Sequence, residues 1–82
     1  MKESYTILLD TIDRVKDFAN IIGRFDAEID LGDGRHVVDA KSIMGVFSLN
    51  LKSPLKLTIC DCSDEEKEPL QKAMQPFIME PS

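Results

Sequence analysis

The centre of this chain reads Lys41-Ser42-Ile43-Met44-Gly45-Val46-Phe47-Ser48-Leu49. Ser42 stands directly before a short apolar-rich segment, which is where a helix N-cap belongs. Its hydroxyl can accept a hydrogen bond from an unpaired N–H group of the first turn. Helical spacing puts apolar side chains on two sides of this turn. One side can face a core and consists of Val46 and Leu49. The other would form an outward patch and consists of Ile43, Met44 and Phe47.

Alternating apolar and polar residues on both sides of this turn predict strands. The clearest alternation is in Phe25–Leu31, whose polar face is acidic, and a turn at 32–34 leads into a return strand at 35–40. Further strands are expected at 5–9 and 55–60. Strands with one wet face predict an antiparallel sheet with helices on its other face. The fold class is therefore α/β, of the α+β kind, in the order strand, helix, strand, strand, helix, strand, helix.

A helix is expected from about Thr11 to Ile22, because apolar residues recur there at helical spacing. Asp10 or Thr11 can cap its start, and Gly23 follows the last apolar position as a stop signal. The predicted apolar stripe consists of Ile12, Val15, Ala19 and Ile22, with Phe18 beside them.

The last helix has a less regular pattern. Ser63 opens a capping box, which predicts a helix start directly after it. Pro69 would then lie too deep in the helix, so we expect either a kink there or a start near Glu68. Pro76 is expected to end the helix, and the tail from Ile78 to Ser82 is expected to fray.

The size and charge of the chain argue against some classes of function. With 82 residues the chain is expected to form one domain, residues 1–82. A net charge of −5 argues against nucleic acid as the main partner, because such binding depends on neutralising phosphates. No apolar run approaches the roughly 18 residues of a membrane span, and the start at Met1–Tyr5 has no signal-peptide pattern. These features favour a cytoplasmic protein.

No cofactor or metal site is expected. Cys60 and Cys62 are two residues apart at a strand end, so their side chains should point the same way, with poor geometry for a disulfide. A zinc site would need further ligands, and His36 is the only histidine in the chain. We therefore expect two free thiols and an exposed histidine without a role.

The segment Lys41–Leu49 resembles the regulatory-serine segment of HPr, the phosphocarrier family of the bacterial sugar phosphotransferase system. Phe25–Leu31 resembles the strand that precedes it in that family, and the match runs without an obvious gap from about Phe25 to Ile59. The resemblance implies an open-faced β-sandwich, in which three helices cover one face of a four-stranded antiparallel sheet. It agrees with the element order predicted from periodicity.

Members of this family carry a phosphoryl group on a histidine in a Gly-Leu-His-Ala-Arg-Pro motif at the start of the first helix. Counting back from Phe25 without a gap puts Thr11 at the histidine position, Asp13 at the arginine and Arg14 at the proline. A displacement by one residue restores Arg14 as the arginine but puts Ile12 at the histidine. Neither alignment supplies an imidazole, so no catalytic residue is expected and Thr11 or Asp10 is expected to cap the helix.

The family's second site is a serine that a dedicated kinase/phosphorylase modifies in Gram-positive relatives, and Ser42 matches it. The modified protein then acts as co-effector of a catabolite-control repressor. The resemblance thus implies regulatory phosphorylation at Ser42 and partner binding by the outward patch of Ile43, Met44 and Phe47. The alternative is that Ser42 is only a cap and that these apolar residues belong to the core.

The leading interpretation is a non-enzymatic, monomeric relative of HPr that cannot carry phosphohistidine and works through protein contacts. Its partners would be a serine kinase/phosphorylase and a transcription repressor, or components of the phosphotransferase system. One alternative is a degenerate phosphocarrier with an unconventional acceptor such as Thr11. Another is an unrelated interaction module built on the same scaffold.

Overall fold

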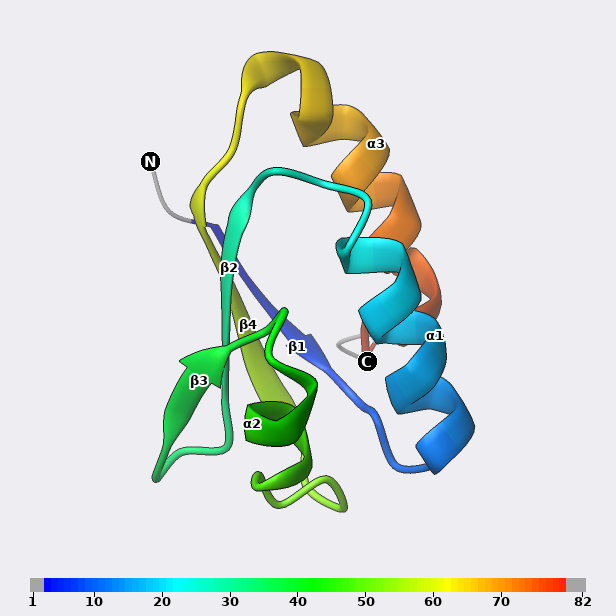
Figure 1. Ribbon diagram of the computed structural model, residues 1–82, viewed down its shortest axis with the longest axis vertical. Helices are drawn as coiled ribbons and strands as arrows, with labels where there is room; N and C mark the ends of the chain where they lie inside the picture. Colours follow the sequence, from blue (N-terminus) through cyan, green and yellow to red (C-terminus); the bar gives the residue numbers. More distant parts are fainter. Residues whose placement is uncertain (1–2, 80–82) are drawn as a thin grey trace.

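The computed structural model describes residues 3–79 (Figure 1). Its elements follow the predicted order: β1 (Glu3–Ile7), α1 (Ile12–Ile22), β2 (Glu28–Gly32), β3 (Val37–Asp39), α2 (Ile43–Phe47), β4 (Leu55–Asp61), α3 (Asp64–Met74) and a short 3₁₀ helix, η1 (Gln75–Phe77). The prediction of seven main elements in the order strand, helix, strand, strand, helix, strand, helix is confirmed.

The strands form one antiparallel sheet in the order β1-β4-β2-β3. Tyr5 pairs with Leu57, and Leu57 also pairs with Leu31, which fixes the register across the three longer strands. In Figure 1, α1 and α3 run side by side along one face of this sheet, and α2 packs near β3. The fold is an open-faced sandwich with three helices on one face, as expected.

The core lies between the sheet and the helices. Each strand contributes alternate residues, because successive side chains point to opposite faces. Phe18 of α1 and Phe77 of η1 meet edge to face, with ring centroids 5.6 Å apart and an interplanar angle of 84°. The largest fully buried side chains are those of Phe18, Ile7, Leu9, Ile22, Ile29, Leu31, Leu55, Leu57, Leu70, Met74, Val15 and Val46.

The predicted stripe of α1 needs one correction. Val15, Phe18 and Ile22 are buried, but Ile12 is 63% exposed. The buried arc is centred near Phe18 and Ile22, and Ile12 lies about a quarter turn away from it at 3.6 residues per turn. Apart from the start of β4 at Leu55, the strands begin and end one to three residues away from the predicted bounds, as is usual where backbone hydrogen bonding decides them.

Helix α3 begins at Asp64 and runs through Pro69, so the prediction of a start near Glu68 is wrong. Ser63 caps it, with Oγ accepting from the Glu66 N–H at 3.3 Å. Pro69 is exposed and lacks only its own N–H donor, and the packing of Leu70 and Met74 holds the helix across it. The helix ends at Met74, directly before η1 and its Pro76.

The tail is more ordered than predicted. Ile78 forms a β-bridge with Ile7, and the Met79 N–H donates to Thr6 O at 2.9 Å. The expectation of fraying is therefore wrong for these two residues, because they pair with the outer edge of β1. Residues 80–82, and Met1 and Lys2 of the segment inspected for a signal peptide, lie outside the described residues.

Candidate functional site

Ser42 is the N-cap of α2, as the sequence predicts. Its backbone is extended, with φ −88° and ψ 100°, and its Oγ accepts a hydrogen bond from the Gly45 N–H at 3.4 Å. Its carbonyl accepts from the Val46 N–H at 2.9 Å, which closes the first turn. The side chain is exposed. The hydroxyl therefore lies on the surface although it is engaged as a cap.

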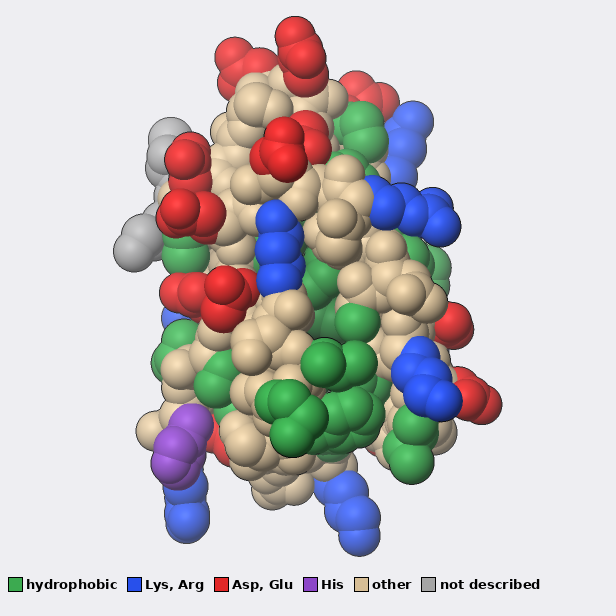
Figure 2. All heavy atoms as spheres, in the orientation of Figure 1, with side chains coloured by type: hydrophobic (Ala, Val, Ile, Leu, Met, Phe, Trp, Pro, Cys, Tyr) green, Lys and Arg blue, Asp and Glu red, His purple; other side chains and the backbone are tan. Residues whose placement is uncertain are grey.

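The side chains that follow divide into two sets, as helical spacing predicts. Val46 and Leu49 are buried in the core. The α2 patch, defined as Ile43, Met44 and Phe47, is exposed by 42%, 78% and 41%. Figure 2 shows apolar side chains gathered in the lower half of the view, over α2. The alternative that these three residues are merely core is wrong for the described structure.

Two contacts fix the position of this short helix. A Cβ on Gly45 would lie 3.2 Å from Val38 Cβ, so glycine allows α2 to approach β3 closely. Asp39 opens the preceding turn, since its Oδ1 accepts from the Lys41 N–H at 2.9 Å. Packing and turn hydrogen bonds therefore stabilise α2, whose five residues are too few for helix propensity to do so.

Asp33 ties the hairpin turn to the loop after α2. Its Oδ1 accepts from the N–H groups of Arg35 and His36, each at 2.9 Å, and its Oδ2 accepts from the Asn50 N–H at 3.0 Å. The backbone hydrogen bonds from His36, Asn50 and Arg35 hold the pKa of this carboxyl well below its usual range. The Gly-Asp-Gly signal predicts the turn, but nothing in the sequence pattern predicts the contact with Asn50.

Thr11 is the N-cap of α1, where its Oγ1 accepts from the Arg14 N–H at 3.1 Å. The structure thus selects Thr11 over Asp10 as the cap. The Arg14 guanidinium folds back onto the chain, donating to Leu8 O and Pro76 O, each at 3.1 Å, and lying 5.4 Å from the Phe77 ring centroid. These two hydrogen bonds from the guanidinium direct Arg14 toward the C-terminal segment, a role that sequence reasoning missed.

His36 is exposed in the turn between β2 and β3. Figure 1 shows this turn at the lower left, on the other side of α2 from the start of α1. The fold therefore does not bring the histidine to the N-terminus of α1. Ser42 and the α2 patch are adjacent, whereas Thr11 lies on a different helix.

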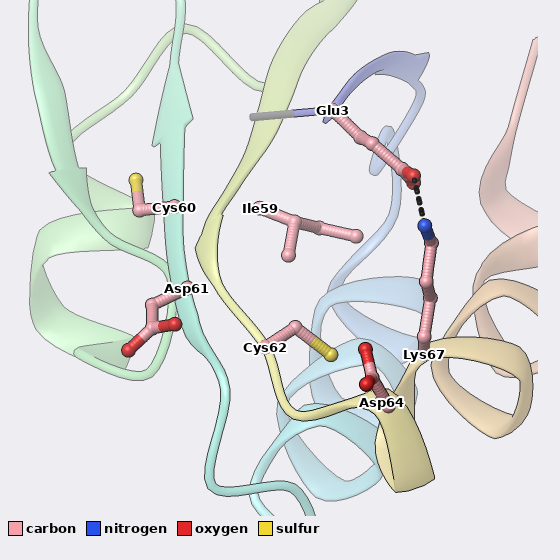
Figure 3. A pocket seen from close by; sticks show the side chains of 7 residues that line it. All are labelled: Glu3, Ile59, Cys60, Asp61, Cys62, Asp64 and Lys67. Atoms are coloured by element: carbon pink, nitrogen blue, oxygen red, sulfur yellow. Dashed lines mark ion pairs between the residues drawn. The ribbon is translucent and has the colours of Figure 1, made fainter. Parts of the chain in front are cut away.

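The two cysteines do not point the same way, which corrects the prediction. Glu28 pairs with Asp61 but Ile29 pairs with Ile59, so β4 has an extra residue at Cys60 and the alternation of faces shifts. Cys60 Sγ donates to Asp30 Oδ2 at 3.3 Å, whereas Cys62 packs against the core. Figure 3 shows the two side chains on opposite sides of the strand.

Cys62 borders a cavity of about 160 Å³ lined also by Glu3, Ile59, Cys60, Asp61, Asp64 and Lys67 (Figure 3). Lys67 Nζ lies 3.4 Å from Glu3 Oε1 across it. Burial, then the negative charges of Glu66 and Asp61, raise the pKa of the Cys62 thiol. Because the thiolate is the reactive form, this environment makes Cys62 a poor nucleophile.

Two further observations concern the described residues 3–79. They hold no group of three or more His, Cys, Asp or Glu side chains arranged to bind a metal ion. No helix among them has both the length and the apolar content needed to cross a membrane.

Three solved structures share this architecture. The chain is similar to the phosphocarrier protein HPr from Bacillus anthracis, with 23% identity, 96% of each chain covered and a TM-score of 0.71. HPr-C-His from Thermoanaerobacter tengcongensis has 21% identity, 94% of this chain and 90% of that chain covered, and a TM-score of 0.69. The histidine-containing phosphocarrier protein of a Mycoplasma has 19% identity, 98% and 100% covered, and a TM-score of 0.67.

At these identities the three structures establish the fold, and a sequence comparison is needed to establish the family. A search among curated proteins found no significant match. A family profile described as the PTS HPr component phosphorylation site matches residues 14–79, which is most of the chain. The open-faced sandwich and this match agree with the resemblance seen around Ser42, and the chain belongs to the HPr family of the phosphotransferase system.

Proposed function

We propose that this protein is a regulatory member of the HPr family that binds other proteins through the α2 patch, under the control of phosphorylation at Ser42. The observation that carries the proposal is the adjacency of an exposed serine hydroxyl and an exposed apolar patch on one short helix. A large exposed apolar patch is typical of an interaction site. Met44, the most exposed of the three residues, has a flexible side chain that can fit different partner surfaces.

The phosphorylation step needs a kinase and a nucleoside triphosphate. The Ser42 hydroxyl loses its proton to a base of the kinase, and Oγ bonds to the γ-phosphorus. The bond from that phosphorus to the bridging oxygen breaks, and the nucleoside diphosphate leaves with the electron pair. The product adds about 1.5 to 2 negative charges beside the α2 patch at pH 7. This chain is the substrate of the step, so it acts here as a non-enzyme.

A role as a phosphohistidine carrier is not part of the proposal. The only histidine, His36, lies in the β2–β3 turn, and Thr11 occupies the helix start where the ungapped alignment expects the family's histidine. Thr11 Oγ1 is engaged with the Arg14 N–H, and a hydroxyl needs an activating base to act as a nucleophile. Arg14 is directed toward Leu8 O and Pro76 O.

The partners we propose are a serine kinase/phosphorylase and a transcription repressor, with components of the phosphotransferase system as the alternative. We also propose that residues 1–82 work as one monomeric domain in the cytoplasm, with no cofactor or metal and no direct contact with nucleic acid or membrane. The net charge of −5 supports protein partners over nucleic acid.

The first experiment incubates the protein with an HPr serine kinase and ATP and measures phosphate incorporation by intact mass. We expect one phosphate on the native chain and none on Ser42→Ala. Ser48→Ala is the matched control, because Ser48 is an exposed serine at the other end of α2. Native protein that takes up no phosphate, or takes it up equally in Ser42→Ala, would contradict the regulatory role.

The second experiment tests the carrier role with enzyme I and phosphoenolpyruvate, using a histidine-containing HPr as positive control. We expect no phosphate on this chain by intact mass. Its appearance would overturn the proposal in favour of an unconventional acceptor, and its loss in Thr11→Ala would identify Thr11 as that acceptor.

The third experiment measures binding of the phosphorylated protein to a catabolite-control repressor, the kind of partner that the family resemblance implies. Phe47→Glu should abolish binding, because it puts a charge into the apolar contact. Val37→Glu is the control, since Val37 is 71% exposed and lies on β3 outside the patch. Equal loss in both variants, or none in either, would rule out the α2 patch as the contact.

A further inference from the structure

One peptide group lies between two oppositely charged side chains. The carbonyl of the Phe25–Asp26 peptide accepts a hydrogen bond from Lys41 Nζ. The N–H of the same peptide donates to both carboxylate oxygens of Glu66, at 3.0 and 3.1 Å. The three parts come from the α1–β2 connection, the residue directly before Ser42, and the first turn of α3.

The two hydrogen bonds strengthen each other because they share one resonant amide. A cation at the carbonyl oxygen draws electron density from the nitrogen, which makes the N–H a better donor to the carboxylate. Such polarisation changes a hydrogen bond by about 10–30% in condensed phases. Both bonds are also charge-assisted, which makes each about twice as strong as a neutral pair. Lys41 and Glu66 are therefore coupled through the peptide between them.

The Glu66 carboxylate is held by this peptide. Glu66 occupies the capping-box position after Ser63, and its N–H donates to Ser63 Oγ at 3.3 Å. Its carboxylate reaches instead across to Asp26, so the usual return contact to the Ser63 N–H is replaced by a bond to the α1–β2 connection. Asp26 and Glu66 also line a cavity of about 220 Å³ with Ala27, Asp61, Cys62 and Ser63.

Lys41 is also the residue next to the proposed phosphorylation site. A phosphate on Ser42 is a dianionic acceptor within reach of that flexible side chain, and it attracts an ammonium more strongly than a neutral carbonyl does. The Lys41 ammonium would then leave the Phe25 carbonyl, and the Asp26 N–H would become a weaker donor to Glu66.

We propose that Lys41 is a positioning residue that transmits the phosphorylation of Ser42 to the start of α3 through the Phe25–Asp26 peptide. The inference rests on the proposed function, since it requires the kinase step with a nucleoside triphosphate described above. Its consequence is that the surface formed by the α1–β2 connection and the first turn of α3 changes together with the α2 patch, although it lies on other elements.

The coupling is tested on the full chain by nuclear magnetic resonance of the Asp26 amide. Lys41→Met should move the Asp26 amide proton upfield and speed its exchange about threefold to tenfold, the change expected for weakening one hydrogen bond. Lys41→Arg keeps a cation that can reach the carbonyl and should restore most of the native values. Lys52→Met, which removes an exposed lysine from the loop after α2, is the matched control and should leave the amide unchanged.

The coupling would be overturned if Lys41→Met left the chemical shift and exchange rate of the Asp26 amide unchanged, or if Lys52→Met changed them equally. These variants replace exposed side chains, and thermal unfolding of each checks that the fold is retained. Glu66→Gln provides a second route, because a neutral acceptor should shift the same amide and reduce its response to Lys41→Met.

The transmission is tested with the phosphorylated protein and with Ser42→Asp, which introduces charge without a kinase. Each should move the Asp26 amide in the same direction as Lys41→Met, and neither should move it further when Lys41 is already Met. If the kinase fails to modify Ser42, the proposed function fails, while Lys41→Met and Ser42→Asp still decide the coupling. If phosphorylation succeeds and the amide stays where it was, the transmission is overturned and the proposed function stands.

Discussion

The Asp33 carboxylate accepts a hydrogen bond from the Asn50 N–H at 3.0 Å, although the two residues are 17 positions apart in the sequence. The same carboxylate caps the β2–β3 turn through the N–H groups of Arg35 and His36. One side chain thus joins the hairpin to the loop that follows α2. The orientation of the α2 patch relative to the sheet depends on this junction as well as on the packing of α2 against β3.

Asp33 should make the free energy of unfolding depend on pH in the acid range. Its pKa in the folded state lies well below the value of 3.8 expected for an unperturbed aspartate, so the unfolded state binds a proton first as the pH falls. The stabilisation is fully present above about pH 5 and is lost as the pH falls through the unfolded pKa toward the folded pKa. Urea unfolding between pH 5 and about pH 2 should show this slope.

Asp33→Asn should unfold at lower urea concentration than the native protein at neutral pH. Its free energy of unfolding should also depend less steeply on pH in acid. Asp17→Asn, which changes an exposed aspartate on α1, is the control. Identical acid slopes for native protein and Asp33→Asn would contradict the assignment.

Gly45→Ala should destabilise the protein by about 1 kcal/mol. Alanine improves helix propensity by about 1 kcal/mol, but overpacking costs about 1–3 kcal/mol. The added Cβ would lie 3.2 Å from Val38 Cβ, an atom fixed by the β3 backbone. Chemical denaturation of Gly45→Ala, Val38→Gly and the double variant measures the effect, because Val38→Gly removes the Cβ that would clash. The double variant should recover the loss, and strict additivity of the two changes would rule out the clash.

Arg14→Met should lower the free energy of unfolding by about 1–3 kcal/mol, because the carbonyls of Leu8 and Pro76 lose a charged donor. The loss should be largest at the C-terminal segment, and hydrogen exchange of the Leu8 N–H, which donates to Phe77 O at 3.0 Å, should report it. Arg14→Lys should recover only part of the effect, since an ammonium lacks the planar fork that reaches Leu8 O and Pro76 O together. Arg24→Met, at an exposed arginine, should leave this amide protected.

Cys62 should react slowly with iodoacetamide near pH 8, because burial and nearby carboxylates raise its pKa and keep it as the thiol. The reaction rate should keep rising above the pH at which the rate of an ordinary cysteine has levelled off. Mass spectrometry of a Cys60→Ser variant measures the rate at Cys62 alone. Asp61→Asn should speed the reaction, and a rate equal to that of a free cysteine at pH 8 would contradict the pKa shift.

Local signals predicted most of the elements correctly. The alternation around Leu31 and the serines that precede α2 and α3 each act over a few residues, and each appears in the structure as expected. The failures have a common cause. The bulge at Cys60, the burial arc that excludes Ile12 and the pairing of Ile78 with Ile7 all depend on partners elsewhere in the chain.

The candidate site shows the same division. The order of elements, the cap at Ser42 and the exposure of Ile43, Met44 and Phe47 follow from residue types and helical spacing, so the amino-acid sequence by itself determined them. Only the tertiary structure decided that Arg14 bonds to Pro76 O, that Asp33 reaches Asn50, and that one peptide group joins Lys41 to Glu66. The physical reason is that periodicity specifies which face of an element is buried, whereas a hydrogen bond between distant groups exists only after packing has brought donor and acceptor within about 3 Å.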